Sequence, residues 1–422
     1  DIIKLNIAIK GESFMFDLNR KNLIKKMKEE SLLILFAGDA PFRSADQQYK
    51  FTPNRNFYYL TGIDDKKVIL TILKTETEVI ENVYVQREDE LMAKWVGRSI
   101  NKDEARKISK VKNIKYIDEF ESTISSYIDR RGIKNIYFDL ERQSIDIPST
   151  KAQDMANLIK IKYPYIKIKN IYSQIVSLRM IKNEDEIKTI KKAISITKEG
   201  IISMAKNIKP NMKEYEVESY FDFEIKRLGA SAHAFNTICA AGKNATVLHY
   251  EDNNQDCTDG DLILFDLGAE YNYYCSDISR TIPINGKFTE RQKQIYSIVL
   301  NCMKEVEKAA KPGITLRDLN DIAKKSLSKG CIDIGLISKE EEIEKYYFHS
   351  IGHSLGLDTH DVWISDSKLE VGSVITNEPG LYIEEEGIGI RLEDDLLITD
   401  FGCTNLSNDI LIEIEDIENL MR

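Results

Sequence analysis

A long helical pattern that starts at Asn183 divides this chain of 422 residues into two parts. Asn183 can cap a helix, and Glu186 follows three residues later, as in a capping box. Pro210 ends the pattern, within which apolar residues recur at helical spacing. At about 150 residues per domain, such a length allows two or three domains. We therefore predict an N-terminal domain over residues 1–175 and a C-terminal domain over residues 176–422.

The N-terminal part alternates short apolar runs, which are typical of strands, with helical patterns. The expected strands are Leu32–Phe36, Phe57–Leu60, Val68–Leu73, Val83–Val85 and Ile136–Phe138. Helical spacing is found in Phe16–Glu30 and Lys102–Val111. Interleaved strands and helices indicate an α/β domain. This part contains no histidine and no dense cluster of polar residues, so it gives little indication of function.

Three further helices are expected in the C-terminal part, with strand pairs between them. The first covers Glu214–Leu228 and ends at Gly229. The expected N-terminal caps of the other two are Thr289, with Gln292 three residues later, and Thr315, with Asp318 three residues later. The last helix is expected to close before Gly330.

Charge and cysteine content exclude several classes of protein. The chain has 59 lysines and arginines against 69 acidic residues, a net charge of −10, whereas nucleic-acid binding needs a concentrated positive surface. No apolar run approaches the ~20 residues that cross a bilayer. The six cysteines lie far apart without a CxxC pair, which argues against a disulfide framework or a thiolate metal site. We therefore expect a cytoplasmic protein that binds neither nucleic acid nor membrane.

Two pairs of acidic residues in the C-terminal part can meet across strand pairs. Asp266 lies in the apolar run Leu262–Leu267, and its midpoint with Asp277 falls between Tyr271 and Asn272. If the chain turns there, the two aspartates face each other with Cβ atoms about 4.5–5.5 Å apart. Carboxylates so close in apolar surroundings repel each other and are costly to desolvate, and a bound cation would resolve both problems.

Glu378 and Glu393 repeat this arrangement around a midpoint between Glu385 and Glu386, inside a polar turn. The short interval between the two acids predicts that this turn is tight. One such pair is equally well explained by solvent-facing acids on a strand surface. Two pairs in the same domain favour a metal site.

Three of the five histidines, His349, His353 and His360, fall within twelve positions. The glycines between them indicate a backbone shaped to aim imidazoles into a pocket. The stretch is not HExxH, which excludes that zinc motif. Gly352–Gly356 also matches the G-x-S-x-G elbow of serine hydrolases, but only His360 follows Ser354, and it is too close to form an independent triad arm.

Taken together, the chain resembles the pita-bread metallopeptidases, and most closely their aminopeptidase P (Xaa-Pro aminopeptidase) branch. The C-terminal motifs that carry the resemblance are Asp266–Ala269, Tyr274, Asp277–Thr281, the histidine stretch with Gly356 and Asp361, Glu378–Tyr382 and Ile390–Asp394. The N-terminal ones are Phe36–Gly38, Arg43–Asp46 and Asn56–Gly62. In this order and spacing the set is highly specific. It implies a creatinase-like α/β N-terminal domain followed by an α+β pita-bread (creatinase/aminopeptidase-like) catalytic domain.

The resemblance implies that five residues hold two divalent metal ions. Asp277 and Glu393 are the expected bridging ligands, Asp266 completes one ion, and His353 and Glu378 complete the other. Four carboxylates and one imidazole form an oxygen-rich set, which suits Mn²⁺ better than Zn²⁺. The family likewise implies manganese, with cobalt or iron as substitutes.

The family's chemistry also implies roles for the residues around the ligands. A hydroxide held by the two metals would attack the scissile carbonyl of a peptide with proline in second position and release the first residue. Glu378 would accept and donate the proton, while His349 and His360 would stabilise the oxyanion or orient the peptide. His249 resembles the family's substrate-side histidine. Arg391, two residues before a ligand, would bind a substrate carboxylate or neutralise ligand charge.

Other functions are known on the same fold. Prolidase, which cleaves only Xaa-Pro dipeptides, is the nearest, and the motifs at Arg43–Asp46 and Asn56–Gly62 favour aminopeptidase P by resemblance. A metal-free creatinase-like hydrolase or a non-catalytic binding protein would be expected to lack metal carboxylates, all of which are present here. Methionine aminopeptidase lacks the large N-terminal domain. Trp95 resembles a family segment that reaches a neighbouring subunit's site, which implies a homo-dimer or homo-tetramer.

Overall fold

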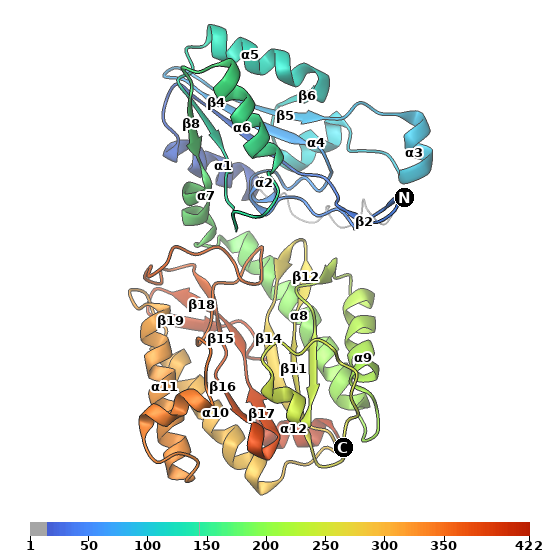
Figure 1. The fold of residues 1–422 in the computed structure, drawn as a ribbon, viewed down its shortest axis with the longest axis vertical. Helices are drawn as coiled ribbons and strands as arrows, with labels where there is room; N and C mark the ends of the chain where they lie inside the picture. The colour runs from blue at the N-terminus through green and yellow to red at the C-terminus, as the bar shows by residue number, and fades with distance from the viewer. Residues whose placement is uncertain (1–14, 143) are drawn as a thin grey trace. The chain divides into compact units, whose positions relative to one another are not determined.

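The computed structural model describes residues 15–142 and 144–422 and is drawn in Figure 1. The chain divides into two compact units, residues 1–179 and 180–422. The boundary expected at residue 175 falls inside helix α7 (Tyr172–Arg179), the last helix of the first unit. Residues 1–14, which belong to the predicted N-terminal domain, lie outside the described part.

The N-terminal unit is built on a six-stranded sheet with the order β6-β5-β4-β1-β7-β8. Strand β4 is antiparallel to both of its neighbours, and the other neighbouring pairs are parallel. The strands of this sheet are β1 (Ser31–Phe36), β4 (Ile69–Lys74), β5 (Val79–Val85), β6 (Asn113–Tyr116), β7 (Asn135–Phe138) and β8 (Lys167–Asn170). A separate short pair consists of β2 (Phe42–Ser44) and β3 (Gln47–Gln48).

Seven α-helices and one short 3₁₀ helix complete the described part of this unit. They are α1 (Met15–Lys26), α2 (Arg55–Thr61), α3 (Glu90–Val96), α4 (Lys102–Ser109), η1 (Ile117–Glu119), α5 (Phe120–Arg130), α6 (Lys151–Lys162) and α7. Parallel strands need such crossover helices, so the sheet agrees with the predicted α/β architecture. The predicted strands at 32–36, 68–73, 83–85 and 136–138 are confirmed, as are the two predicted helices, which correspond to α1 and α4.

The strand predicted at Phe57–Leu60 is wrong, because this segment is helix α2. The Asn54 side chain accepts a hydrogen bond from the backbone N–H of Phe57 and caps the helix. Gly62 ends it with a φ of 66°, in the left-handed region that favours glycine. Nearly every residue of α2 is buried, so the short apolar run carries no helical periodicity by which it could be told from a buried strand.

The C-terminal unit consists of antiparallel strands and two pairs of long helices. Its α-helices are α8 (Glu184–Asn207), α9 (Glu214–Arg227), α10 (Glu290–Ala309), α11 (Leu316–Asp333) and α12 (Ile414–Leu420). Its 3₁₀ helices are η2 (Gly242–Thr246), η3 (Glu340–Lys345) and η4 (Glu384–Glu386). Its strands are β9 (Ala232–His233), β10 (Ile238–Ala241), β11 (Leu262–Leu267), β12 (Ala269–Tyr271), β13 (Tyr274–Cys275), β14 (Ile278–Pro283), β15 (Val374–Asn377), β16 (Gly380–Ile383), β17 (Ile388–Arg391), β18 (Asp394–Thr399) and β19 (Gly402–Asn405).

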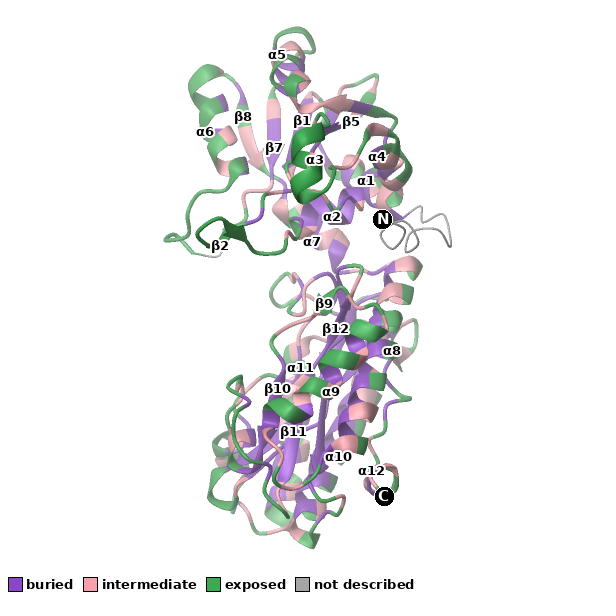
Figure 2. Cartoon of the chain, turned by 90° about the vertical axis from the view of Figure 1, so that its right-hand side faces the viewer, coloured by how far each residue is buried: buried purple, intermediate pink, exposed green. Residues whose placement is uncertain are grey.

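The strands of this unit pair as β10-β11-β14, β13-β12-β9, β15-β18-β19 and β16-β17. Helix α8 packs against β12, β13 and β14, whereas α10 packs against β15, β16 and β17, and both helices lie behind the strands in Figure 1. Strands β11 and β14 are buried along almost their whole length (Figure 2). The strands that carry or flank the acidic residues are therefore covered on one face by the helices α8 and α10.

The predicted caps of this unit are confirmed. Asn183, Thr289 and Thr315 each accept a hydrogen bond from the N–H three residues later, within capping boxes. The expected end of α11 before Gly330 is wrong, because the helix continues to Asp333. A Cβ on Gly330 would lie 2.6 Å from a methyl carbon of Ile298 in α10, so this glycine allows two helices to pack closely and does not end one. Across residues 15–142 and 144–422, no helix has the length and apolar composition of a membrane-spanning segment.

Candidate functional site

The first acidic strand pair has a different register from the one predicted. Strands β11 and β14 pair so that Asp266 lies opposite Ser279, and Asp277 precedes β14. The predicted direct pairing of Asp266 with Asp277 is therefore wrong by two positions. Side chains alternate between the faces of a strand, so Asp277 still shares the face of Asp266 and is its diagonal neighbour.

This shift arises in the turn. Tyr271 pairs with Tyr274, which leaves Asn272 and Tyr273 as a two-residue loop. Their φ values of 49° and 66° are those of a type I′ turn, the loop that matches the twist of a tight hairpin. Tyrosine is not a usual residue at the second position of this turn, so the sequence did not indicate where the chain reverses.

The second acidic strand pair has the predicted register. Gly380 pairs with Arg391, and the N–H of Leu392 donates to the carbonyl of Pro379 at 3.2 Å, which continues the same register outward. One step further, Glu378 lies opposite Glu393, as predicted. The turn between the strands is tight, as expected, because η4 closes on Gly387 with a φ of 63°.

The segment that carries the histidines lies along strand β15. A Cβ on Gly352 would lie 2.2 Å from the carbonyl oxygen of Thr376, so only glycine allows this approach. The N–H of His353 then donates to Oγ1 of Thr376 at 3.0 Å. The same hydroxyl donates to Oε1 of Glu378 at 3.2 Å, so one threonine positions two predicted ligands. The rings of His353 and His360 lie 4.1 Å apart.

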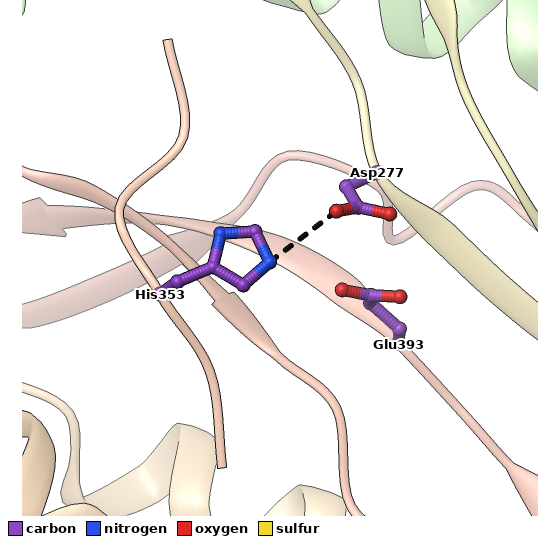
Figure 3. A group of neighbouring side chains, drawn as sticks. All are labelled: Asp277, His353 and Glu393. Carbon is purple, nitrogen blue, oxygen red and sulfur yellow. Dashed lines mark ion pairs between the residues drawn. The ribbon is translucent and has the colours of Figure 1, made fainter. Parts of the chain in front are cut away.

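Asp277, His353 and Glu393 form the centre of the site (Figure 3), with one ligand atom from each lying within 4.8 Å of the others. Nδ1 of His353 lies 3.1 Å from the carbonyl oxygen of Ser354, and a carbonyl only accepts, so this nitrogen carries the proton. Nε2 is therefore the nitrogen turned toward the carboxylates, 3.4 Å from Oδ2 of Asp277 and 3.5 Å from Oε1 of Glu378. In the neutral imidazole this nitrogen carries a lone pair, which a metal ion can accept.

The carboxylates of this centre lack the partners that burial requires. Among the described residues, Oδ1 of Asp266 and Oδ1 of Asp277 are buried without a hydrogen-bond partner. Burial raises the pKa of Asp277 well above its usual range, and the charge of Asp266 raises it further. Burial and the charge of Asp277 do the same to Glu393. Buried charges are normally paired or bound to metal, so the residues present fit a divalent cation.

Arg391 is 3% exposed, and three of its nitrogens have protein partners. It donates to Oδ2 of Asp266 at 2.6 Å, to the hydroxyl of Tyr382 at 2.9 Å and to Oγ of Ser279 at 2.9 Å. Ser279 in turn donates to Oε2 of Glu393 at 2.8 Å. Of the two roles expected for Arg391, these contacts favour the neutralisation of ligand charge over the binding of a substrate carboxylate.

His349 is held in one tautomer. Its Nδ1 donates to the carbonyl of Ser350 at 2.8 Å, so its Nε2 accepts from the Tyr382 hydroxyl at 2.9 Å. Burial and the charge of Arg391 lower the pKa of His349 to about 4. The imidazole is therefore neutral near pH 7.

His360 and His249 occupy the more exposed side of the site. Burial, His353 and His249 together lower the pKa of His360, and His249 also lowers the pKa of His349. Leu248 and Tyr250, which flank His249, pack against a buried cluster that contains Tyr382, the hydrogen-bond partner of His349, so the segment of His249 lies near the site although it is far from it in the sequence. The structure thus brings together Asp277, His353 and Glu393 with Glu378 adjacent, while Asp266 is joined to them through Arg391.

Several residues that shape the site had no predicted role. Tyr382, Ser279 and Thr376 hold the ligands and histidines, and each lies within or two residues from a predicted motif. The most distant is Lys182, whose ammonium lies 3.0 Å from Oδ2 of Asp361 with both side chains 1% exposed. No spacing rule links residues so far apart, so the sequence alone offered no signal for this ion pair.

The chain matches two protein-family models. The model of metallopeptidase family M24 matches residues 188–400, a range that includes every predicted ligand. The model of the aminopeptidase P N-terminal domain matches residues 16–137.

Two known proteins are similar to the chain over nearly its whole length, and a third over about two thirds of it. The Xaa-Pro aminopeptidase of Haemophilus influenzae is 32% identical over 425 residues, which covers 96% of this chain and 96% of that protein. The solved structure of a candidate aminopeptidase P from Bacillus anthracis is 50% identical, with a TM-score of 0.96 over 98% of this chain and 99% of that one. The Xaa-Pro dipeptidase of Pyrococcus furiosus is 36% identical over 270 residues, 63% of this chain and 74% of that protein.

Proposed function

Since the chain belongs to metallopeptidase family M24, we propose that it acts as an Xaa-Pro aminopeptidase, which releases the first residue from peptides with proline in second position. The predicted fold, an α/β N-terminal domain followed by a pita-bread catalytic domain, is confirmed. The observation that carries the proposal is the position of Nε2 of His353, which faces carboxylate oxygens of Asp277 and Glu378. Near-full-length similarity to Xaa-Pro aminopeptidases supports the substrate class.

Family membership implies divalent metal ions, and we propose that this chain holds two of them. The proposed ligands are Asp266, Asp277, His353, Glu378 and Glu393, with Asp277 and Glu393 shared between the ions. The two orphaned carboxylate oxygens, the raised pKa values of Asp277 and Glu393 and the approach of His353 Nε2 to two carboxylates support this set. Four carboxylates and one imidazole favour Mn²⁺ as the native ion.

Divalent ions in such a site lower the pKa of a coordinated water and polarise the scissile carbonyl. We assign the proton transfer to Glu378, whose Oε1 accepts from Thr376. We assign the orientation of the peptide or the stabilisation of the substrate oxyanion to His349, whose Nδ1 lies 3.8 Å from Oε2 of Glu378, and to His360, whose ring centroid lies 4.1 Å from that of His353. The neutral state of His349 suits a hydrogen-bonding role near pH 7.

His249 and Arg391 complete the proposed site. His249 is exposed, and its neighbours Leu248 and Tyr250 pack against the cluster that contains Tyr382, which suits contact with the substrate. Arg391 is enclosed by protein partners, so we assign it to the neutralisation of ligand charge and to the positioning of Asp266 and Tyr382.

We also propose that the protein is a homo-dimer or homo-tetramer in a reducing cytoplasm. Helix α3 has no buried residue, and Trp95 on it is 79% exposed, which suits a contact with another subunit. The six cysteines, all in the described part of the chain, form no disulfide, and five of them are buried. A monomer mass in light scattering, or export of the protein on cell fractionation, would contradict these two assignments.

The test of function compares two substrates before and after metal replacement. The protein is treated with a chelator and assayed on Gly-Pro and on a longer Xaa-Pro-Xaa peptide, with and without added Mn²⁺. An Ala-for-Pro peptide of the same length is the control. Mn²⁺-dependent release of the first residue from the longer proline peptide alone is the expected result.

Prolidase activity is the second candidate, and the similarity to the Pyrococcus furiosus dipeptidase favours it. Cleavage of Gly-Pro without cleavage of the longer peptide would move the assignment to prolidase. Silence on both peptides, with no metal retained after dialysis, would support a non-catalytic binding protein.

A further inference from the structure

The carboxylate of Glu214, at the start of helix α9, is fully buried and accepts four hydrogen bonds. Oε1 accepts from the N–H of Ala241 at 2.7 Å and from Nδ2 of Asn244 at 2.9 Å. Oε2 accepts from the hydroxyl of Tyr250 at 2.8 Å and from the N–H of Gln255 at 2.9 Å. A carboxylate has about four acceptor positions, so these donors satisfy it completely.

All four donors belong to one segment, residues 241–255. The segment leaves β10, passes through η2 and His249, and returns toward β11. Oε1 binds its outgoing arm and Oε2 binds its returning arm. The backbone of Glu214 adds a bond, because its N–H donates to the carbonyl of Gln255 at 3.0 Å. Glu214 therefore ties both arms of the segment to α9.

His249 lies between the two tied arms, directly before Tyr250. Its two neighbours in the sequence, Leu248 and Tyr250, pack against a buried cluster that contains Tyr382, the hydrogen-bond partner of His349, so the segment lies next to the site. Burial and the Glu214 carboxylate raise the pKa of Tyr250 to about 12, so its hydroxyl stays protonated and keeps donating. The position of His249 thus depends on neighbours that Glu214 holds.

We propose that Glu214 is the positioning residue for His249 on the substrate side of the site, an inference that rests on the proposed function. Burial of a carboxylate is costly unless it is fully hydrogen-bonded. An acid with a purely local role in α9 would bond to that helix, whereas the four side-chain bonds of Glu214 all go to the segment that presents His249. Glu214 is too deeply buried to touch the peptide itself.

The first test replaces Glu214 by Gln, which keeps the side-chain volume and one acceptor but turns the other oxygen into a donor. The N–H of Gln255 then faces a donor and loses its partner. We expect kcat/KM for the Xaa-Pro-Xaa peptide to fall roughly ten- to a hundred-fold, because catalysis is sensitive to small misplacements. Bound Mn²⁺ should stay at the wild-type level, since no proposed ligand is in the segment.

The matched control is Glu216→Gln. Glu216 lies on the same helix, but it is exposed, and its side chain accepts from the N–H of Lys213 at 2.7 Å, at the cap of its own helix and not in the segment. Glu216→Gln removes the same charge by the same substitution, and the kcat/KM of this variant should stay within about two-fold of wild type. A drop equal to that of Glu214→Gln would overturn the proposal, because helix charge would then explain the loss.

A double-mutant cycle separates positioning from general destabilisation. If Glu214 acts through His249, then His249→Ala and the double variant Glu214→Gln/His249→Ala should have the same kcat/KM. If the two losses multiply instead, Glu214 does not act through His249 and the proposal fails. Tyr250→Phe removes a single donor and leaves the carboxylate in place, so it provides the same cycle where Glu214→Gln does not fold.

Hydrogen exchange tests the same inference without reference to activity. In the metal-free protein, Glu214→Gln should speed exchange across residues 241–255, while α10 and β15 keep their wild-type rates. Unchanged exchange in the segment would overturn the proposal. If the wild-type protein cleaves no proline peptide while exchange responds as expected, the proposed function fails and the hold of Glu214 on the segment stands.

Discussion

The two acidic strand pairs of the C-terminal unit bring their carboxylates to one centre, but they do so through different turns. The pair around Asn272 closes on two residues with positive φ, and Asp266 faces Ser279. The pair around Glu385 closes through η4 and Gly387, and Glu378 faces Glu393. A shift of two positions leaves each side chain on its original face, because strands alternate with a period of two. The turn therefore sets which residue faces an acid but not which side of the sheet the acid occupies.

This difference has a chemical consequence. The shift in the first pair places a hydroxyl, Ser279, opposite Asp266, and that hydroxyl links Arg391 to Glu393. The second pair places two carboxylates directly opposite each other, and Thr376 supports one of them from the preceding strand. The first pair thus provides charge compensation for the centre, and the second provides opposed carboxylates.

The largest effect is expected from loss of one carboxylate charge in either pair. Asp277→Asn should lower kcat/KM by roughly a thousand-fold or more, since a metal bridge supplies several kcal/mol of transition-state stabilisation. Burial raises the pKa of Asp277, so the metal-free fold gains little from its charge and the melting temperature should not fall. Glu393→Gln, from the second pair, should be equally inactive. Wild-type activity in a folded Asp277→Asn protein would rule out a bridging role.

The next largest effect is expected at Glu186 of helix α8, which packs against β12, β13 and β14 on the side of the first pair. Tyr274 of β13 donates to Oε1 of Glu186 at 3.0 Å, and burial raises the pKa of Glu186 to about 7. A raised pKa means that the folded state holds a proton which the unfolded chain releases above its own pKa of about 4.5. The stability that this proton contributes is complete below about pH 4.5 and is lost as the pH rises through about 7.

Glu186→Gln mimics the protonated acid and keeps the capping box of α8. Relative to wild type, its free energy of unfolding should rise as the pH increases from 5 to 8, by up to about 3 kcal/mol. Urea denaturation of the metal-free proteins at both pH values measures this difference. An equal difference at pH 5 and pH 8 would show that Glu186 does not titrate in this range.

A smaller effect is expected from the two hydroxyls that support the ligands. Ser279→Ala should weaken Mn²⁺ binding roughly 10- to 100-fold, because it breaks the link between Arg391 and Glu393. Thr376→Ala should weaken it by about ten-fold at most, since its bond to Glu378 is longer, at 3.2 Å. Competition titrations with a metal indicator measure both. If Thr376→Ala weakens Mn²⁺ binding more than Ser279→Ala does, the link from Arg391 through Ser279 is not what distinguishes the first pair from the second.

The sequence predicted the long elements and the ligand-bearing strands because their signals are local. Capping residues such as Asn183 and Thr289 form hydrogen bonds within their own helices. The acids lie on short apolar strands, whose side chains alternate every two residues. The elements it misjudged are those that distant residues decide. Phe57–Leu60 is buried by distant residues, so it lacks the periodicity that would mark it as a helix, and α11 continues through Gly330 where Ile298 packs against this glycine.

The site follows the same division. The predicted ligands lie in motifs that the sequence alone reveals, and the structure brings three of them together. The supporting contacts come from residues that no spacing rule connects, such as Lys182 with Asp361 and Arg391 with Tyr382. The register of the first pair was missed because its turn contains Tyr273, a residue without turn propensity.

The smallest effect is expected from a substitution in the turn of the second pair, which tests whether the turn or the strands determine the register. Gly387→Ala places a Cβ at a φ of 63°, which should cost about 1 kcal/mol of stability. Activity should stay near wild type, because the strands β16 and β17 and their buried side chains also specify the register. Asn272→Ala is the matched change in the first pair, where only two residues close the loop and Asn tolerates positive φ better than Ala. If Gly387→Ala abolishes activity while the protein remains folded, the turn alone sets the opposition of Glu378 and Glu393, and the second pair depends on its loop as strongly as the first.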